Sequence, residues 1–183
     1  MSLADDLASP PPEDLEALGP PADHEAVARK ILLDQLTGRA RTRAELATKL
    51  AKKQVPSEVA DRLLDRFEEV GLVDDAAFAR EWVQTRQSGR GLARRALSAE
   101  LRRKGVDQQV IAEAVETVET DDEIEAARHL VRRKLPSLQR HNDVVVVRRL
   151  TGMLARKGYP PGVAYRVVRE EIAGAEELLD GVE

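Results

Sequence analysis

Apolar residues recur along this chain at the three- and four-residue spacing of amphipathic helices, and not at the two-residue alternation of strands. Between residues 27 and 67 they form three runs, each of which predicts one helix: Val27, Ile31, Leu32 and Leu36; Leu46 and Leu50; Val59, Leu63, Leu64 and Phe67. Gly38 suits the end of the first helix, Thr42 and Glu45 form a capping box at the second, and Pro56 opens the third. The pattern therefore predicts a unit of three short helices.

This unit occurs three times. Three decapeptides share Leu at the first and fifth positions and a basic pair ending in Lys at the seventh and eighth: LATKLAKKQV (46–55), LSAELRRKGV (97–106) and LTGMLARKGY (150–159). A shift of 51 residues aligns the first two copies without a gap, whereas the third aligns at a shift of 48 in its front half and 53 in its back half. The difference falls around LPSLQRHND (135–143), where Pro136 and polar residues predict a longer loop.

The predicted fold is all-α, an elongated array of three tandem three-helix repeats that resemble helix-turn-helix units. A low aromatic content of 3% favours such helices over a sheet sandwich. The repeats are assigned to residues 25–73, 74–120 and 121–173. Residues 1–24, rich in proline and acids, are expected to be a disordered arm, and residues 174–183 an acidic tail.

Charge is distributed unevenly along the chain. The net charge is −4, yet all 29 basic residues lie between residues 27 and 173, where only 22 acidic residues accompany them. This excess of seven positive charges suits a polyanion or an acidic partner. A solubilising role for the acidic ends and competition with the basic body remain equal alternatives.

Residue types exclude several kinds of chemistry. There is no Cys, and His24, His129 and His141 lack the spacing of metal ligands. Gly89-Arg90-Gly91 lacks the rest of a nucleotide-binding motif and is interpreted as a helix stop, while the acids at 121–123 suit a helix start. We expect no enzyme, no cofactor and no metal. No apolar run reaches bilayer length, so a cytoplasmic protein without a membrane partner, and a monomer, is expected.

The basic residues cluster on the first-helix end, the loop and the second helix of each copy, whereas third helices of copies one and two are acidic. A repeated stripe favours phosphate tracking along single- or double-stranded DNA. The candidate contacts are Arg86, Arg90, Arg94, Arg95, Arg102, Arg103, Lys104, Arg132, Arg133, Arg148, Arg149, Arg156 and Lys157. For any one of them a solvated charged face, or a favourable charge at a helix end, is the simpler interpretation.

The segment VGLVDDAAFAREWVQTRQSGRGLARRALSAELRRKGV (70–106) resembles the RecX family of regulators of the RecA recombinase. The residues that carry the resemblance are Gly71, Leu72, Asp74, Asp75, Phe78, Ala79, Arg86, Gly89, Glu100, Leu101, Lys104 and Gly105. Departures are Ala96, where the family has a branched apolar residue, and Gln54, where copies two and three have Gly105 and Gly158. We interpret the pair Asp74-Asp75 as a helix cap and a joint between repeats, and we assign the cap to Asp75. Phe78 and Trp82 are interpreted as core residues.

The resemblance implies an elongated modulator that binds in the groove of the RecA filament on DNA. It would inhibit ATP hydrolysis, strand exchange and co-protease activity, and so act on homologous recombination, DNA repair and the SOS response. Two other functions stay open. One is a DNA-binding regulator that reads bases with the last helix of copy three, through Tyr165, Arg166 and Arg169. The other is a helical adaptor for an acidic protein.

Overall fold

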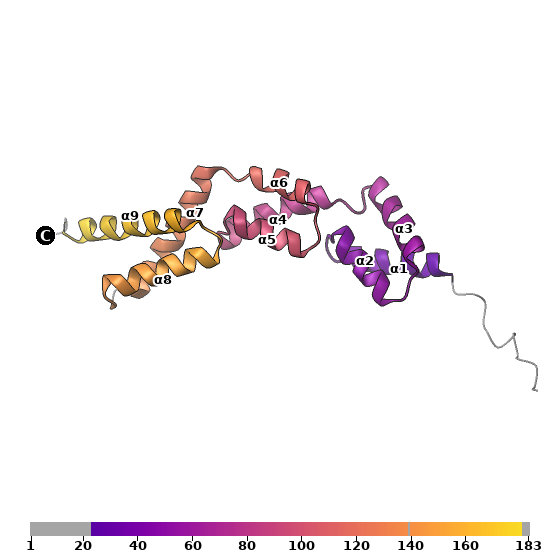
Figure 1. Ribbon diagram of the computed structural model, residues 1–183, viewed down its shortest axis with the longest axis horizontal. Helices are drawn as coiled ribbons and strands as arrows, with labels where there is room; N and C mark the ends of the chain where they lie inside the picture. The colour runs from indigo at the N-terminus through magenta and orange to yellow at the C-terminus, as the bar shows by residue number, and fades with distance from the viewer. Residues whose placement is uncertain (1–22, 139, 181–183) are drawn as a thin grey trace, which may run out of the picture.

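The computed structural model describes residues 23–138 and 140–180, with side chains up to residue 175 (Figure 1). These residues form nine α-helices and one 3-10 helix and contain no strand, which confirms the all-α prediction. The helices are α1 (His24–Leu36), α2 (Arg43–Lys52), α3 (Ser57–Glu69), α4 (Asp75–Arg90), α5 (Arg94–Arg103), α6 (Gln108–Glu116), α7 (Thr120–Lys134), η1 (Leu135–Leu138), α8 (Asp143–Arg156) and α9 (Pro161–Asp180). The repeats follow one another along the long axis of the molecule.

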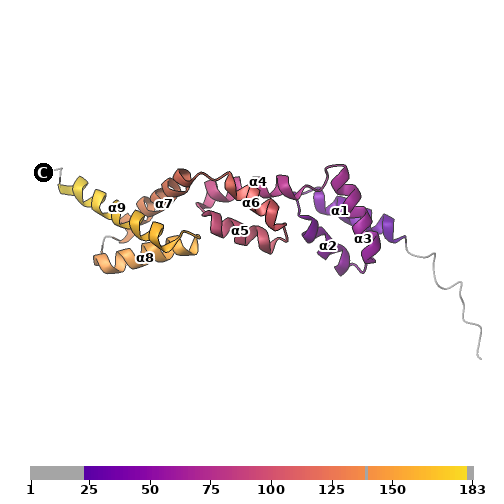
Figure 2. The same ribbon diagram turned by 45° about the horizontal axis from the view of Figure 1, so that its top comes forward.

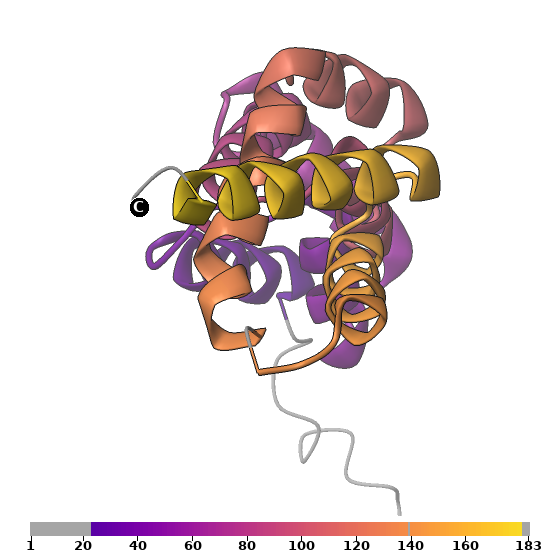
Figure 3. The same ribbon diagram turned by 90° about the vertical axis from the view of Figure 1, so that its left-hand side faces the viewer.

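Each repeat has its own hydrophobic core, built from the apolar runs of its three helices. Leu50, Leu101 and Leu154, which occupy the same position in the three decapeptides, are all completely buried. Phe78 belongs to the core of repeat 2, and Trp82 packs against that core while partly exposed. Repeat 3 ends in the long helix α9, which lies across α7 and α8 when viewed from the C-terminal end (Figure 3).

Helix ends follow the sequence signals closely, with two corrections. The capping box of Thr42 and Glu45 is present at α2. Asp74, and not Asp75, caps α4, because its carboxylate accepts a hydrogen bond from the Ala77 N–H. Gly89 lies inside α4 and does not end it; the helix ends at Gly91, whose φ of 59° is in the left-handed region.

Repeat 3 differs from expectation in two places: before α8 and at the C-terminal end of α9. The additional residues of repeat 3 form η1 and an early first turn of α8, and not simply a longer loop. Helix α9 continues to Asp180, so the segment from residue 174 begins as helix. The expected disordered arm lies outside the described residues except at its end, where Asp23 caps α1 and His24 begins it.

Equivalent turns make the contacts that join consecutive repeats. The turn after α5 approaches the start of α2, and the turn after α8 approaches the start of α5. The Thr42 hydroxyl donates to the Lys104 carbonyl at 2.7 Å, and the equivalent Ala93 N–H donates to the Lys157 carbonyl at 2.9 Å. A Cβ at Gly105 would lie 2.3 Å from the Ala44 Cβ. The joints therefore require a residue without a side chain.

Carboxylates from the first helix of the later repeat complete each joint. The Asp75 carboxylate accepts from the Arg43 N–H at 2.9 Å, and the Glu123 carboxylate accepts from the Arg94 N–H at 2.8 Å. Both acceptors serve the free N–H groups at the start of a second helix. At the second joint the buried Tyr159 hydroxyl also donates to the Gly91 carbonyl, and burial, with the nearby Glu123 charge, raises its pKa to about 12.

Gln54 departs from this pattern, and in the described part of the chain no repeat precedes repeat 1. It occupies the position of Gly105 and Gly158, with a φ of 58°, and its side chain is exposed. Among residues 23–138 and 140–180 no other second helix approaches this turn, so the left-handed conformation constrains the residue there. A polar side chain can therefore replace glycine here.

Candidate nucleic-acid interface

The second helices of the three repeats, α2, α5 and α8, lie in a row along one side of the array in both side views (Figures 1 and 2). They occupy equivalent places because they are the same element of a repeated unit. Each ends with a cation at the same position: Lys52, Arg103 and Arg156. These three side chains are exposed, and none forms an ion pair with a described residue. Hereafter they are the helix-end cations.

Several of the thirteen candidate cations instead have structural partners. The Arg94 guanidinium donates to the Val118 carbonyl, with its Nε at 2.8 Å, and so ties the start of α5 to the end of repeat 2. Arg86 lies over the Trp82 ring, 4.1 Å from its centroid, and is 3.5 Å from the Glu100 carboxylate. Both guanidinium groups therefore already have interaction partners within the fold.

Lys104 belongs to the first joint. Its Nζ atom lies 2.7 Å from Glu45 of repeat 1 and 4.5 Å from the centroid of the Trp82 ring. Burial raises the pKa of Glu45, but the hydrogen bonds from Lys104 and the Thr42 backbone outweigh it and leave that pKa below its ordinary value. Lys104, which the sequence analysis proposed as a ligand contact, thus pairs with a carboxylate across the joint.

Lys157 has the equivalent place at the second joint, where it donates to the Arg90 carbonyl. Burial, together with the charges of Arg133 and Arg90, lowers its pKa. Its ammonium group therefore serves as a hydrogen-bond donor to backbone in a region already crowded with positive charge.

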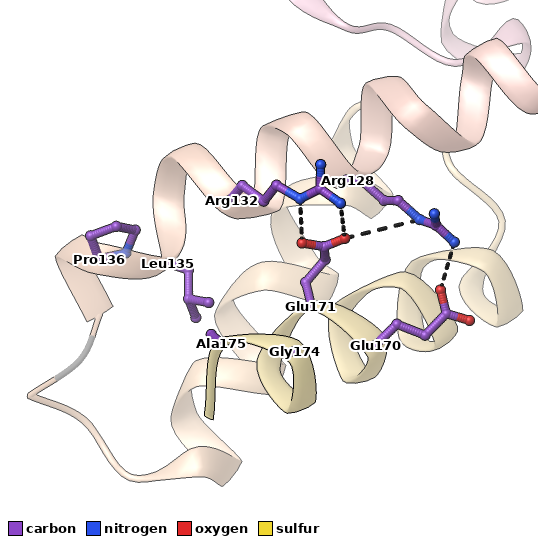
Figure 4. Close-up of a pocket in the computed structure, with 8 residues that line it drawn as sticks. All are labelled: Arg128, Arg132, Leu135, Pro136, Glu170, Glu171, Gly174 and Ala175. Carbon is purple, nitrogen blue, oxygen red and sulfur yellow. Dashed lines mark hydrogen bonds and ion pairs between the residues drawn. The ribbon is translucent and has the colours of Figure 1, made fainter. Parts of the chain in front are cut away.

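Arg132 is neutralised within repeat 3. Its guanidinium makes two hydrogen bonds to Glu171, at 2.6 and 2.8 Å, while Arg128 binds Glu170 at 2.9 Å (Figure 4). Between α7 and α9 these pairs line a pocket of about 570 Å³. Because each arginine faces a carboxylate, the pocket offers an anion little net attraction.

The remaining candidates are exposed, and most of them line three hollows. Arg103 contributes to a hollow between repeats 1 and 2, Arg90 and Arg133 to one between α4 and α7, and Arg148, Arg149 and Arg156 to one on α8. Arg95 is exposed outside these hollows, and Arg102 is 3.2 Å from the Gln108 side-chain oxygen.

The candidate contacts named from the sequence omit three cations of the first hollow. Lys49 lies there with Lys52 and Arg41, whose Nε atom is buried without a hydrogen-bond partner among the described residues. A helical spacing of three residues between Lys49 and Lys52 was the available signal, because it places both on one face of α2.

The alternative reading head, α9, is less open than its sequence suggested. Its face with Ala164, Val167 and Val168 is buried in the core of repeat 3. Arg166 lies 3.9 Å from Glu170, and Tyr165 is 57% exposed. The free face therefore carries Tyr165, Arg166 with a carboxylate nearby, and the exposed Arg169.

An all-helical array of three-helix repeats with a row of exposed cations along one side is the class of protein that this fold and surface define. Three family models match the chain: the first RecX three-helix domain at residues 28–67, the second at 74–115 and the third at 121–168. The chain belongs to the RecX family.

Curated relatives support this assignment. A regulatory protein RecX from Thermobifida fusca (strain YX) is 53% identical over 152 residues, which cover 83% of this chain and 82% of that protein. A regulatory protein RecX from Mycobacterium ulcerans (strain Agy99) is 48% identical over 172 residues, 93% of this chain and 96% of the relative.

Solved structures share the fold. The crystal structure of RecX from Lactobacillus salivarius superposes with a TM-score of 0.75 at 17% identity, covering 83% of this chain and 99% of that one. A second crystal structure, of a regulatory protein RecX, gives a TM-score of 0.73 at 24% identity and covers 82% and 73% of the two chains. In the described part of the chain no helix is long and apolar enough to cross a membrane.

Proposed function

We propose that this protein is a negative regulator of RecA that binds in the helical groove of the RecA filament on DNA. It reduces ATP hydrolysis, strand exchange and co-protease activity, and thereby modulates homologous recombination, DNA repair and the SOS response. It acts as a cytoplasmic monomer, without cofactor, metal or membrane. Membership of the RecX family supports RecA as the partner, because the resemblance to this family implies a regulator of that recombinase.

The observation that carries the proposal is the row of helix-end cations on α2, α5 and α8. A ligand with charge along its whole length can engage all three repeats, whereas a compact ligand can engage only one. Phosphates along DNA supply such a regular line of charge. The row thus suits a long polyanion, or a filament that carries one.

The exposed candidates, and not the paired ones, are proposed to make the contacts. An exposed arginine without a carboxylate partner can bind phosphate in bidentate fashion without breaking an existing ion pair. The proposed contact set is Lys52, Arg90, Arg95, Arg102, Arg103, Arg133, Arg148, Arg149 and Arg156. Arg86, Arg94, Lys104, Arg132 and Lys157 support the fold.

DNA-dependent ATP hydrolysis by RecA on single-stranded DNA tests this function. The full chain is titrated from well below stoichiometry, and its binding to the bare DNA is measured in parallel. Inhibition at ratios too low to coat the DNA is expected. No inhibition up to equimolar protein would refute regulation of the filament.

The parallel binding measurement separates the other functions. A base-reading regulator would prefer one duplex sequence, whereas phosphate contacts give strong salt dependence with little sequence preference. An adaptor for an acidic protein would leave bare DNA unbound. We favour phosphate contacts because exposed cations that have no carboxylate partner among the described residues are spread over three repeats, while base reading would depend on α9 alone.

A further inference from the structure

Repeat 3 carries a hollow of about 410 Å³ whose lining contains four cations and no acid. Lys134, Arg148, Arg149 and Arg156 surround it, and all four are exposed. Hereafter it is the α8 hollow. Leu138 and Met153 give it an apolar base, and Gly152 leaves room between Arg148 and Arg156, which lie one turn to either side along α8. Four like charges facing one space repel one another unless an anion lies between them.

The equivalent surfaces of the other repeats differ at two informative positions. Alignment of the second helices places Arg149 at the position of Glu45 in repeat 1, and Met153 at the position of Glu100 in repeat 2. Glu45 binds Lys104, and Glu100 binds Trp82 and lies near Arg86. Repeats 1 and 2 therefore carry a carboxylate that neutralises cations of the array, while repeat 3 has none at either position.

The position in the array explains this difference. In repeat 1 the turn of repeat 2 forms the other wall of the hollow, and Lys104 from that turn pairs with Glu45 inside it. Repeat 3 precedes no further repeat in the described chain, so no such turn covers α8. A surface that elsewhere receives a cation has become one that presents cations to solvent.

We propose that the α8 hollow binds the phosphodiester backbone of a DNA strand, with Arg148 and Arg156 each contacting one phosphate. This deepens the proposed function and rests on it for the identity of the DNA. Arg148 and Arg156 lie eight residues, or about 12 Å, apart along the axis of α8, roughly the distance between alternate phosphates in an extended strand. Arg149 is directed partly elsewhere, because its guanidinium lies 2.6 Å from the His141 ring.

The test compares Arg148→Gln/Arg156→Gln with wild type in the full chain. Binding of a fluorescently labelled oligothymidylate is measured by anisotropy over a series of salt concentrations. Each single-strand phosphate contact contributes about 0.7 to the slope of log affinity against log salt, so two lost contacts reduce the slope by about 1.4. The affinity then falls on the order of 25-fold at about 0.1 M salt.

A matched control removes the same charge elsewhere. Arg62 and Arg66 are exposed on α3 and line a surface hollow together with the acids Glu25, Asp65 and Glu69. Arg62→Gln/Arg66→Gln is expected to leave the salt slope unchanged. Equal slopes for the two double variants, or no oligonucleotide binding by wild type, would overturn the proposal, because site-specific contacts would then be absent.

ATP hydrolysis by RecA, measured with the same variants, distinguishes this site from the wider function. If the α8 double variant binds DNA like wild type but inhibits RecA less, the hollow receives an acidic protein surface and the proposal is wrong. If the salt slope falls as expected but wild type never inhibits RecA, the DNA site stands and the proposed function fails. Unchanged far-UV circular dichroism confirms that the variants remain folded.

Discussion

Replacing Gly105 with alanine tests the tight joint between the first two repeats. The added Cβ would lie 2.3 Å from the Ala44 Cβ, and the backbone has a φ of 77°. A left-handed conformation costs an L-residue about 1 to 2 kcal/mol, and overpacking adds about 1 to 3 kcal/mol. Gly71→Ala separates these costs, since Gly71 has a φ of 72° but no atom near its Cβ position. Gly105→Ala should therefore destabilise by about 1 to 3 kcal/mol more than Gly71→Ala.

A second substitution shows where the clash lies. Ala44→Gly removes the obstructing Cβ and leaves the Ala44 Cα at 3.8 Å, an ordinary contact. In a double-mutant cycle Ala44→Gly should recover about 1 to 3 kcal/mol in the Gly105→Ala background. At the second joint the Ala96 backbone N remains 2.6 Å from a Cβ at position 158, so Ala96→Gly should recover much less for Gly158→Ala.

Urea denaturation supplies the free energies of unfolding. Trp82 is the single tryptophan and touches Lys104 at the first joint, so its fluorescence follows that joint, while far-UV circular dichroism follows the helices of all three repeats. Two-state behaviour is checked by comparing both signals for each variant. Absence of coupling between Gly105→Ala and Ala44→Gly would show that the joint is open in solution and would refute the reasoning.

Further substitutions give distinct expected outcomes. Glu45 has a lowered pKa, so its stabilisation is present above pH 4.5 and is lost as the pH falls through the folded-state value; Glu45→Gln should lose less stability than wild type on acidification. Burial raises the pKa of Asp75 despite its hydrogen bond to Arg43, so its stabilising contribution is present below pH 3.8 and is lost as the pH rises through the folded-state value; Asp75→Asn should gain stability relative to wild type as the pH rises above 3.8. Arg94→Ala should cost about 1 to 3 kcal/mol in urea denaturation by leaving the Val118 carbonyl unpaired, whereas Arg95→Ala should change stability by less than about 0.5 kcal/mol.

The repeat was predictable because core leucines and helix signals are local in sequence. The recurrence of Leu46, Leu97 and Leu150 at fixed shifts identifies the second helix, and all three are buried as expected. Recurring glycine after the basic pair also carried information about the joint, since only copies that follow another repeat contain it. Repeat 1 has Gln54 at this position, and the difference carried the same information. The sequence alone could not show that the glycine contacts the preceding repeat.

The roles of individual cations were less predictable, because their partners come from distant parts of the chain. Lys104 meets Glu45 across 59 residues, and Arg132 meets Glu171 across 39. Charge counting treats these cations like the exposed Arg103 and Arg156. Only the fold separates side chains that hold repeats together from those left for a ligand, and the ligand contacts themselves remain predictions.

The joints also affect folding during synthesis, because each joint contact of an earlier repeat needs a partner that is synthesised later. The Thr42 hydroxyl reaches its carbonyl partner 62 residues further along the chain. At a translation rate of about 5 to 20 residues per second, that partner emerges roughly 3 to 12 seconds later. Repeat 1 therefore leaves the ribosome with one edge unpaired, and a nascent chain stopped after repeat 1 or repeat 2 exposes the joint surface that the next repeat would have covered.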